Sequence, residues 1–209
     1  MKIYDISMEI HENMPVYNNL EEKKPKIEVK RDFETSNGYE SKIEMDMHTG
    51  THLDMPLHMI EGGKTLDYLD LYKVVTKCKV FDFTDVDSMI TQKELESKKI
   101  EEGDFIILKT KNSFADDFDF EFIYLEKSGA KYLADKNIKG VGIDALGIER
   151  SQKDHATHNT ILEKDIVIVE GLSLKDVEEG EYLFIGAPLK IKGVEAAPLR
   201  ALLIEDYRG

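Results

Sequence analysis

The sequence has little cysteine and no long apolar run. Its 209 residues include a single cysteine, Cys78, so no disulfide can form within the chain, as is typical of proteins in a reducing compartment. No stretch approaches the ~20 apolar residues of a membrane-spanning helix. The opening residues MKIYDISMEI alternate charged and apolar side chains and lack the apolar centre of a signal peptide. We therefore expect a cytoplasmic protein with no membrane partner.

Basic residues are also scarce. The chain has 28 Lys and Arg against 42 Asp and Glu, which gives a formal net charge of −14. Phosphate contacts require a basic patch, and the sequence does not contain one, so we expect no nucleic-acid partner. The acidic residues are spread out and mixed with lysines, as on a solvated surface. Such a surface favours cations and a neutral or cationic small-molecule substrate.

Motifs of several common enzyme classes are missing. There is no Gly-rich phosphate loop, no Gly-x-Ser-x-Gly nucleophile elbow and no zinc-finger spacing. Cys78 lies inside a predicted strand with no histidine near it in the sequence, so we do not expect it to act as a nucleophile. The length fits one α/β or all-β domain, or at most two small ones. Because no linker or repeat is evident, we expect a single domain over residues 1–209.

What the sequence does have is a concentration of histidine in the eleven residues 48–58. This stretch holds three of the six histidines and one aspartate, namely His48, His52, Asp54 and His58. Polar residues alternate with mostly apolar ones over residues 43–59. That period of two predicts extended chain, with one face in a core and the imidazoles and carboxylate on the other.

The spacing within this stretch constrains a metal site. In a fully extended chain His48 and His52 would lie roughly 13 Å apart. One metal ion, with histidine nitrogens at ~2.0–2.1 Å, could not bind both. Either the chain bends at Gly50, or the two histidines serve different centres. Gly50 tolerates the positive φ that a bend requires, so we favour the bend.

The rest of the chain alternates predicted strands and helices. A hairpin is expected around the turn at residues 36–38, and a βαβ-like passage is expected around the second helix. The expected strands cover residues 3–10, 26–33, 39–49, 78–84, 104–111, 141–146, 166–172, 181–192 and 199–205. Three helices are expected. A short one begins at a capping box at 91–94 and ends before Gly103, and the other two cover 124–137 and 151–162.

A second histidine cluster lies in the last predicted helix, where His155 and His158 share a face at a spacing of three. The following strand ends in Glu170, a carboxylate that is costly to bury unless something pairs with it. Histidine and carboxylate ligands without cysteine suit a catalytic zinc, manganese or iron ion. The candidate ligands are His48, His52, Asp54, His158 and Glu170. Five ligands exceed one tetrahedral site, so two ions sharing Asp54 or Glu170 are an alternative to one. The role of His155 stays open.

The pattern His48-x-Gly50-Thr51-His52-x-Asp54-x-Pro56-x-His58 resembles the signature of the cyclase or kynurenine formamidase (arylformamidase) family of metal-dependent hydrolases. The resemblance extends over nearly the whole chain. It continues in the family's order through Asp5-Ile6-Ser7, Gly142-Ile143-Asp144, His158, Glu170-Gly171-Leu172 and Ala196-Ala197-Pro198-Leu199-Arg200.

The resemblance implies a division of the metal ligands. It places His48, His52 and Asp54 on one divalent ion, and Asp54, His158 and Glu170 on a second, with Glu170 also touching the first. Zinc is the expected ion, and Mn²⁺ or Fe²⁺ are alternatives because nitrogen and oxygen ligands accept all three.

Further implications concern the pocket and the fold. His58 matches the family's proton donor and acceptor, and Tyr17 falls near an aromatic residue that lines the substrate pocket. The implied fold is a swivelling β/β/α domain, an α/β (α+β) fold with a mixed sheet and a few flanking helices. The implied assembly is a homodimer or homotetramer with the pocket near a subunit contact.

Two positions depart from the family pattern. The chain has Tyr17-Asn18-Asn19-Leu20 where Tyr-Pro-Gly-Asp is frequent, and Gly147 where a serine is common. Both departures lie in segments expected to shape the substrate pocket, and both leave the metal motif intact.

The resemblance implies an arylformamidase-like amide hydrolysis, of N-formylkynurenine to kynurenine and formate, by metal-activated water with His58 as general acid and base. A cyclic amide such as an isatin-like lactam, or an ester, is the alternative substrate class. From a different class, a non-catalytic metal-dependent small-molecule binding protein is the other reading. The altered loop at 17–20 favours it, whereas His58, which a pure binder would not need, argues against it.

Overall fold

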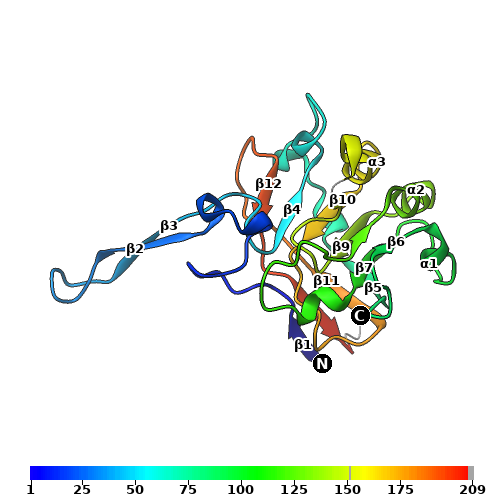
Figure 1. Ribbon diagram of the computed structural model, residues 1–209. Helices are drawn as coiled ribbons and strands as arrows, with labels where there is room; N and C mark the ends of the chain where they lie inside the picture. Colours follow the sequence, from blue (N-terminus) through cyan, green and yellow to red (C-terminus); the bar gives the residue numbers. More distant parts are fainter. Residues whose placement is uncertain (151, 207–209) are drawn as a thin grey trace.

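The computed structural model describes residues 1–150 and 152–206, and its centre is a large mixed sheet (Figure 1). Nine strands form this sheet in the order β1-β13-β11-β5-β7-β9-β10-β4-β12. Their bounds are β1 Lys2–Asp5, β4 His52–Asp54, β5 Val75–Asp82, β7 Phe105–Lys109, β9 Gly140–Ile143, β10 Val167–Glu170, β11 Gly180–Ile185, β12 Ala196–Pro198 and β13 Leu202–Glu205.

The centre of the sheet is parallel and its wings are antiparallel. β5, β7, β9 and β10 run parallel to one another, while β4 and β12 on one side and β11, β13 and β1 on the other pair antiparallel. Parallel neighbours need a crossover connection. The α2 helix, Lys127–Asp135, provides it between β7 and β9, so the predicted βαβ passage is present.

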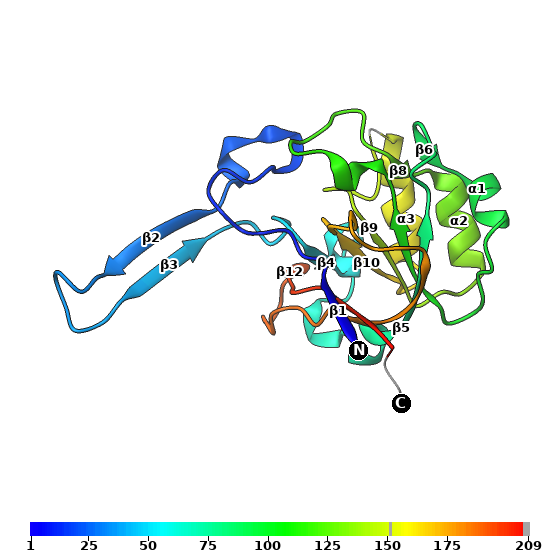
Figure 2. The same ribbon diagram turned by 90° about the horizontal axis from the view of Figure 1, so that it is seen from below.

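Three short helices cover one face of the sheet (Figure 2). α1 (Gln92–Glu96) begins at the predicted capping box, and α3 (Ala156–Leu162) packs beside α2. Alternation along β7 divides the interior in two, because Ile106 and Leu108 face the helices whereas Phe105 and Ile107 belong to the core on the opposite face. Both faces of the central strands are therefore buried, as expected for parallel strands.

Two further small sheets lie outside the large one. β6 (Met89–Ile90) pairs with β8 (Tyr124–Leu125). β2 (Lys26–Arg31) and β3 (Glu40–Glu44) form an antiparallel hairpin that projects away from the body (Figures 1 and 2). The hairpin predicted around residues 36–38 is present.

Several predicted element boundaries are wrong. The strand expected over 39–49 ends at Glu44, and Ile43 is 49% exposed, so its alternation marks an exposed hairpin instead of a core face. The chain then turns before β4. The strand expected over 181–192 ends at Ile185, and the short strand β12 had no prediction. A strand ends where its hydrogen bonding to the neighbouring strand ends. The alternation of apolar residues in one segment does not show that point, so these boundaries were missed.

The last predicted helix is also shorter than expected. Residue 151 lies outside the described residues, and Asp154 and His155 have positive φ values of 63° and 48°, so α3 begins only at Ala156. His155 and His158 therefore do not share a helix face. The expected fold class, mixed α/β with a large mixed sheet and few helices, is confirmed. None of the helices in the described residues is long and apolar enough to cross a membrane.

Candidate metal centre

The register between β4 and β10 builds the centre of the site. Glu170 is the direct cross-strand partner of His52, and Asp54 lies two residues further along on the same face. Leu53 points the other way, into the core on the far face of the sheet. All three polar side chains are almost completely buried, at 1% exposure for His52, 0% for Asp54 and 5% for Glu170. Two apolar strands thus hold three ligand-type side chains together.

A bend at Gly50 brings in His48. Gly50 has a φ of 68°, and the Nδ1 of His48 lies 3.0 Å from Oδ1 of Asp54. A side chain at Gly171, which also has a positive φ, would collide with the Gly50 carbonyl, since a Cβ there would lie 2.4 Å from that oxygen. The hydroxyl of Thr51 donates to the Gly171 carbonyl at 2.5 Å. The bend is therefore held against the end of β10, and it brings the ring centroids of His48 and His52 to 5.0 Å from each other.

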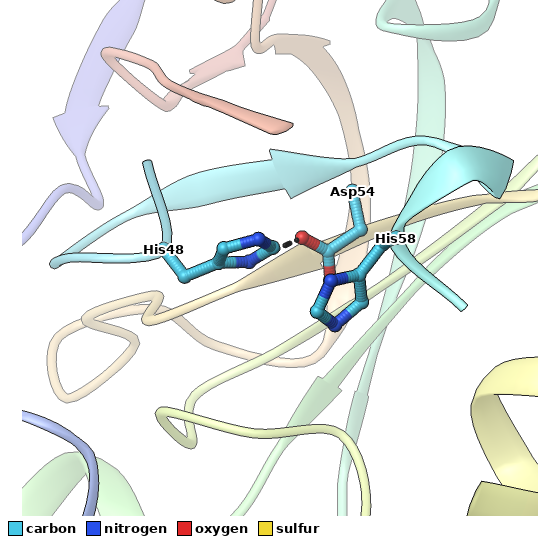
Figure 3. A group of neighbouring side chains, drawn as sticks. All are labelled: His48, Asp54 and His58. Atoms are coloured by element: carbon cyan, nitrogen blue, oxygen red, sulfur yellow. Dashed lines mark ion pairs between the residues drawn. The ribbon is translucent and has the colours of Figure 1, made fainter. Parts of the chain in front are cut away.

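His58 enters from the other side, on the 3-10 turn Pro56–His58 that follows β4. Figure 3 shows the imidazoles of His48 and His58 next to the Asp54 carboxylate, and their ring centroids are 4.2 Å apart. His158 lies 5.4 Å from His58 by the same measure. Burial and the neighbouring His48 and His158 lower the pKa of His58 below its ordinary value of 6.5. His58 is therefore a neutral imidazole at pH 7.

His158 is the link to α3. Its Nε2 lies 3.3 Å from Oε1 of Glu170 and 3.9 Å from Oδ2 of Asp54. Its Nδ1 lies 2.7 Å from Oε1 of Glu149, a buried carboxylate that also accepts a hydrogen bond from the Thr157 backbone N–H. Glu149 thereby directs the Nε2 lone pair of His158 into the site, as outer carboxylates do for metal-binding histidines.

The same arrangement holds for His52. Its Nδ1–H donates a hydrogen bond to the carbonyl oxygen of Gly50 at 2.9 Å, and its Nε2 faces Asp54 and Glu170. His48 lies between two carboxylates, with Nδ1 toward Asp54 and Nε2 3.3 Å from Oε1 of Glu195.

Unpartnered polar atoms test whether a metal fits. Across residues 1–150 and 152–206, four buried side-chain polar atoms have no hydrogen-bond partner, and three of them are Nε2 of His52 and both oxygens of Asp54. Buried polar atoms are nearly always satisfied, and leaving them unpaired is costly. Three electron-pair donors converging at one point are what a divalent cation would satisfy. The residues present therefore fit a metal.

The charges of the site point the same way. Burial opposes the charged form of each group, but mutual attraction outweighs it. The carboxylates Asp54 and Glu170 raise the pKa of His52 to about 9, and His52 and its neighbours hold the pKa values of Asp54 and Glu170 below their ordinary range. Glu149 and Glu170 likewise raise the pKa of His158 to about 10 against the effect of burial. The buried carboxylates therefore favour positive charge at this site.

The structure brings all five predicted ligands and His58 together. Two compact groups, in which the potential ligand atoms of all members lie within 4.8 Å of one another, share Asp54: one with His48 and His58, the other with His52 and Glu170. His58 thus lies as close to Asp54 as a ligand would, a proximity that its predicted role in proton transfer did not require. A third such group joins Glu149, His155 and His158.

Tyr17 lies at the edge of this site. Its ring packs edge-on against that of Phe118, with ring centroids 5.4 Å apart. Burial, together with the charges of Glu170 and Glu149, raises the pKa of its hydroxyl. A Cβ at Gly147 would lie 3.1 Å from the Tyr17 ring. Gly147, one departure from the family pattern, therefore lies against Tyr17, the residue that directly precedes the other departure. The next two residues, Asn18 and Asn19, have φ values of 58° and 53°, a region that asparagine tolerates better than most residues.

Sequence reasoning missed Glu149 and Glu195. Both are carboxylates that contact a predicted histidine ligand from the outside, Glu149 through His158 and Glu195 through His48. Neither lies in a periodic pattern or within ten residues of the main histidine stretch. The only available signal for Glu149 was its position nine residues before His158, which no helical or strand period explains.

Comparison with known proteins identifies the family. The family model described as "Putative cyclase" matches residues 4–150. Cyclase-like protein 3 of Arabidopsis thaliana is 35% identical over 98% of this chain and 80% of its own length. Kynurenine formamidase of Bacillus cereus is 31% identical over 78% of each chain.

A solved structure agrees with these relatives. A protein described as a potential metal-dependent hydrolase with cyclase activity superposes with a TM-score of 0.90 at 51% identity, over 97% of this chain and 96% of that one. The chain belongs to the cyclase family of hydrolytic enzymes. The family and the enzyme class expected from the sequence are confirmed, and the site fits a divalent metal.

Proposed function

We propose that this enzyme hydrolyses the carbon–nitrogen bond of a small amide, with N-formylkynurenine as the substrate and kynurenine and formate as the products. One observation carries the proposal: unpartnered nitrogen and oxygen atoms of His52 and Asp54 converge beside the neutral imidazole of His58. The similarity to kynurenine formamidase supports the choice of a formamide.

We assign the metal to the shared carboxylate Asp54. His48, His52 and Asp54 would hold one divalent ion, and His158 and Glu170 would hold a second that also uses Asp54. Zinc is the ion proposed, with Mn²⁺ or Fe²⁺ as alternatives, because all ligand atoms are nitrogen or oxygen. A divalent metal bound there supplies Lewis-acid chemistry, which makes water more acidic and polarises a carbonyl group.

His58 moves the proton. As a neutral base it accepts a proton from the attacking water while the water oxygen forms a bond to the formyl carbon. It then donates that proton to the amide nitrogen as the carbon–nitrogen bond breaks, so that the amine leaves neutral. Amide nitrogen is a poor leaving group without protonation, which makes the second transfer as necessary as the first. Tyr17 borders the space where the aromatic part of the substrate would lie.

The test is an assay of purified protein of known metal content. We expect N-formylkynurenine to be converted to stoichiometric kynurenine and formate, activity to be abolished by a chelator, and activity to be restored by zinc. Isatin and a simple aryl ester, assayed in parallel, represent the alternative substrate classes. A kcat/KM for isatin or the ester well above that for N-formylkynurenine would replace the proposed substrate. No metal-dependent turnover of any of the three would refute amide and ester hydrolysis together.

A further inference from the structure

Glu149, His155 and His158 form a cluster of ligand-type side chains beside the centre built on Asp54. The Nδ1 of His158 and the Nδ1 of His155 lie 2.7 Å and 3.0 Å from the same carboxylate oxygen, Oε1 of Glu149. The potential ligand atoms of all three residues lie within 4.8 Å of one another. Ligand atoms around one tetrahedral zinc ion are roughly 3.3 Å apart, since each bond is ~2.0–2.2 Å long. The three atoms therefore need only small movements to hold one ion.

The protein itself fixes the Glu149 carboxylate by its other oxygen. Oε2 accepts hydrogen bonds from the backbone N–H of Thr157 at 2.9 Å and from the side-chain amide of Gln152 at 3.0 Å. Oε1 is left to the two imidazoles. It is therefore held in place as a ligand atom before any ion arrives.

The cluster leads from the surface to the interior. The side chain of His155 is 64% exposed, whereas those of Glu149 and His158 are 4% and 7% exposed. Asp154 and His155 both have a positive φ, which is unfavourable for residues with a side chain, and this conformation accompanies the contact of the His155 ring with Glu149. The net charge of −14 attracts cations to the surface. A metal ion that arrives from solvent meets His155 first.

The imidazole of His158 connects this cluster to the centre on Asp54. Its Nδ1 faces Glu149, and its Nε2 lies 3.3 Å from Oε1 of Glu170. A neutral imidazole has one lone pair, so it binds an ion through Nδ1 or through Nε2 but not through both. With the ion at Nδ1, the single ring proton is on Nε2 and is donated to Glu170. With the ion at Nε2, that proton is on Nδ1 and is donated to Glu149. One ring can thus serve two sites in turn.

We propose that Glu149, His155 and His158 form an outer site that captures a divalent transition-metal ion from solvent and passes it to the inner centre. Nitrogen and carboxylate oxygen ligands suit zinc in particular. Once Nε2 of His158 holds an inner ion, the outer site keeps only Glu149 and His155 and binds weakly. Outer occupancy is therefore transient. The transfer rests on the proposed assignment of His158 to the inner centre, whereas the outer site itself does not.

The first experiment measures how fast metal-free full-length protein takes up zinc, by stopped-flow mixing with a chromogenic zinc indicator. His155→Asn removes the imidazole and keeps a residue that tolerates positive φ. It should slow zinc uptake at least ~10-fold, because local capture of ions raises association rates by that order or more. The equilibrium zinc affinity of the inner centre should stay unchanged. His11→Asn, which removes an exposed histidine elsewhere, is the matched control and should take up zinc at the wild-type rate.

Rate and affinity together separate capture from a structural role. A His155→Asn protein with the wild-type uptake rate would overturn the capture of entering ions. A lowered equilibrium affinity with an unchanged rate would mean that His155 acts only by supporting Glu149, and would overturn the proposal as well.

The second experiment isolates the outer site by calorimetric titration with zinc. Asp54→Ala lacks the carboxylate that the inner ions would share, and it should bind one zinc ion per chain, weakly enough that dialysis removes it. Asp54→Ala combined with His155→Asn should show no such binding. Equal zinc binding by the two proteins, or none in Asp54→Ala, would overturn the outer site. Because neither uptake rate nor calorimetry depends on turnover, failure of the proposed amide hydrolysis would be seen separately.

Discussion

The Nδ1 of His158 lies 2.7 Å from Oε1 of Glu149, and the Nε2 of the same ring lies 3.3 Å from Oε1 of Glu170. The imidazole is thus oriented by one buried carboxylate toward another. Such outer contacts fix the tautomer and the ring orientation of a metal ligand. Glu149 and Glu195 are the two carboxylates that the sequence did not reveal. The contact of Glu149 with His158 is more deeply buried than that of Glu195 with His48.

Glu149→Gln should weaken metal binding without removing it. The neutral amide is nearly isosteric but accepts a weaker hydrogen bond from Nδ1–H of His158, so we expect metal affinity to fall ~10–100-fold. Chelator competition measures the change. Glu163→Gln, an exposed glutamate at the end of α3, is the matched control and should have wild-type affinity. Equal affinities in the two variants would contradict the orienting role.

Asp54→Ala should abolish both metal content and activity. Asp54 belongs to both compact ligand groups, and its two buried oxygens have no hydrogen-bond partner. Removing it deletes a carboxylate that both proposed ions share. Elemental analysis after purification gives the metal content per chain. A metal-replete and active Asp54→Ala protein would rule out a shared carboxylate.

His58→Ala should keep the metal and lose activity by ~10²–10⁴-fold, since proton transfer by a positioned side chain contributes about that factor. Burial lowers the pKa of His58, so in wild type the rate should rise with pH through a midpoint below 6.5. The rate rises with pH because a general base acts only when it is unprotonated. The variant should lack this limb of the pH profile. Loss of stoichiometric metal in His58→Ala would instead make His58 a ligand.

Metal binding should release protons. Burial would lower the pKa values of His52 and His158, but neighbouring carboxylates outweigh it and raise them to about 9 and about 10. Both rings are therefore protonated at pH 7 without metal, whereas a ligand must be neutral. Calorimetric titration in buffers of different ionisation enthalpy counts the protons displaced. We expect affinity to rise with pH toward about 9, and a count of zero at pH 7 would contradict these shifts.

The same two histidines determine how the metal-free protein responds to pH. Their folded pKa values lie above the unfolded value of about 6.5. Their contribution to stability is therefore complete below about pH 6.5 and is lost as the pH rises through about 9 to 10. The Tm of chelator-treated protein should fall over that range. Zinc-loaded protein should show a smaller fall, because its histidines carry no proton to lose.

Gly147→Ser should displace Tyr17. A Cβ at Gly147 would lie 3.1 Å from the Tyr17 ring, so the ring must shift by a few tenths of an ångström. We expect KM for the amide substrate to change several-fold and metal content to stay constant, because the atoms nearest such a Cβ belong to Tyr17 and to the backbone of Glu149. Kinetics on N-formylkynurenine and a smaller formanilide make the comparison. Identical KM values in both proteins would remove Tyr17 from the substrate pocket.

The sequence by itself determined the chemistry of the centre. The period of two over residues 52–55 put His52 and Asp54 on one face and Leu53 and Met55 on the other, because successive side chains of a strand point in opposite directions. It also located the bend, since Gly50 is the one position there that adopts a positive φ without strain. The capping box and the apolar run before Glu170 were equally local signals.

Only the tertiary structure decided which distant residues meet. The antiparallel register of β4 with β10 places Glu170 opposite His52, and no local pattern encodes a pairing between strands more than a hundred residues apart. The same holds for Glu149 and Glu195, which contact the ligands from loops without any period. The alternation that continues back to Ile43 belongs to the projecting hairpin of β2 and β3, outside the core. Alternation shows that a strand has two different faces, whereas the packing of the whole chain decides what each face meets.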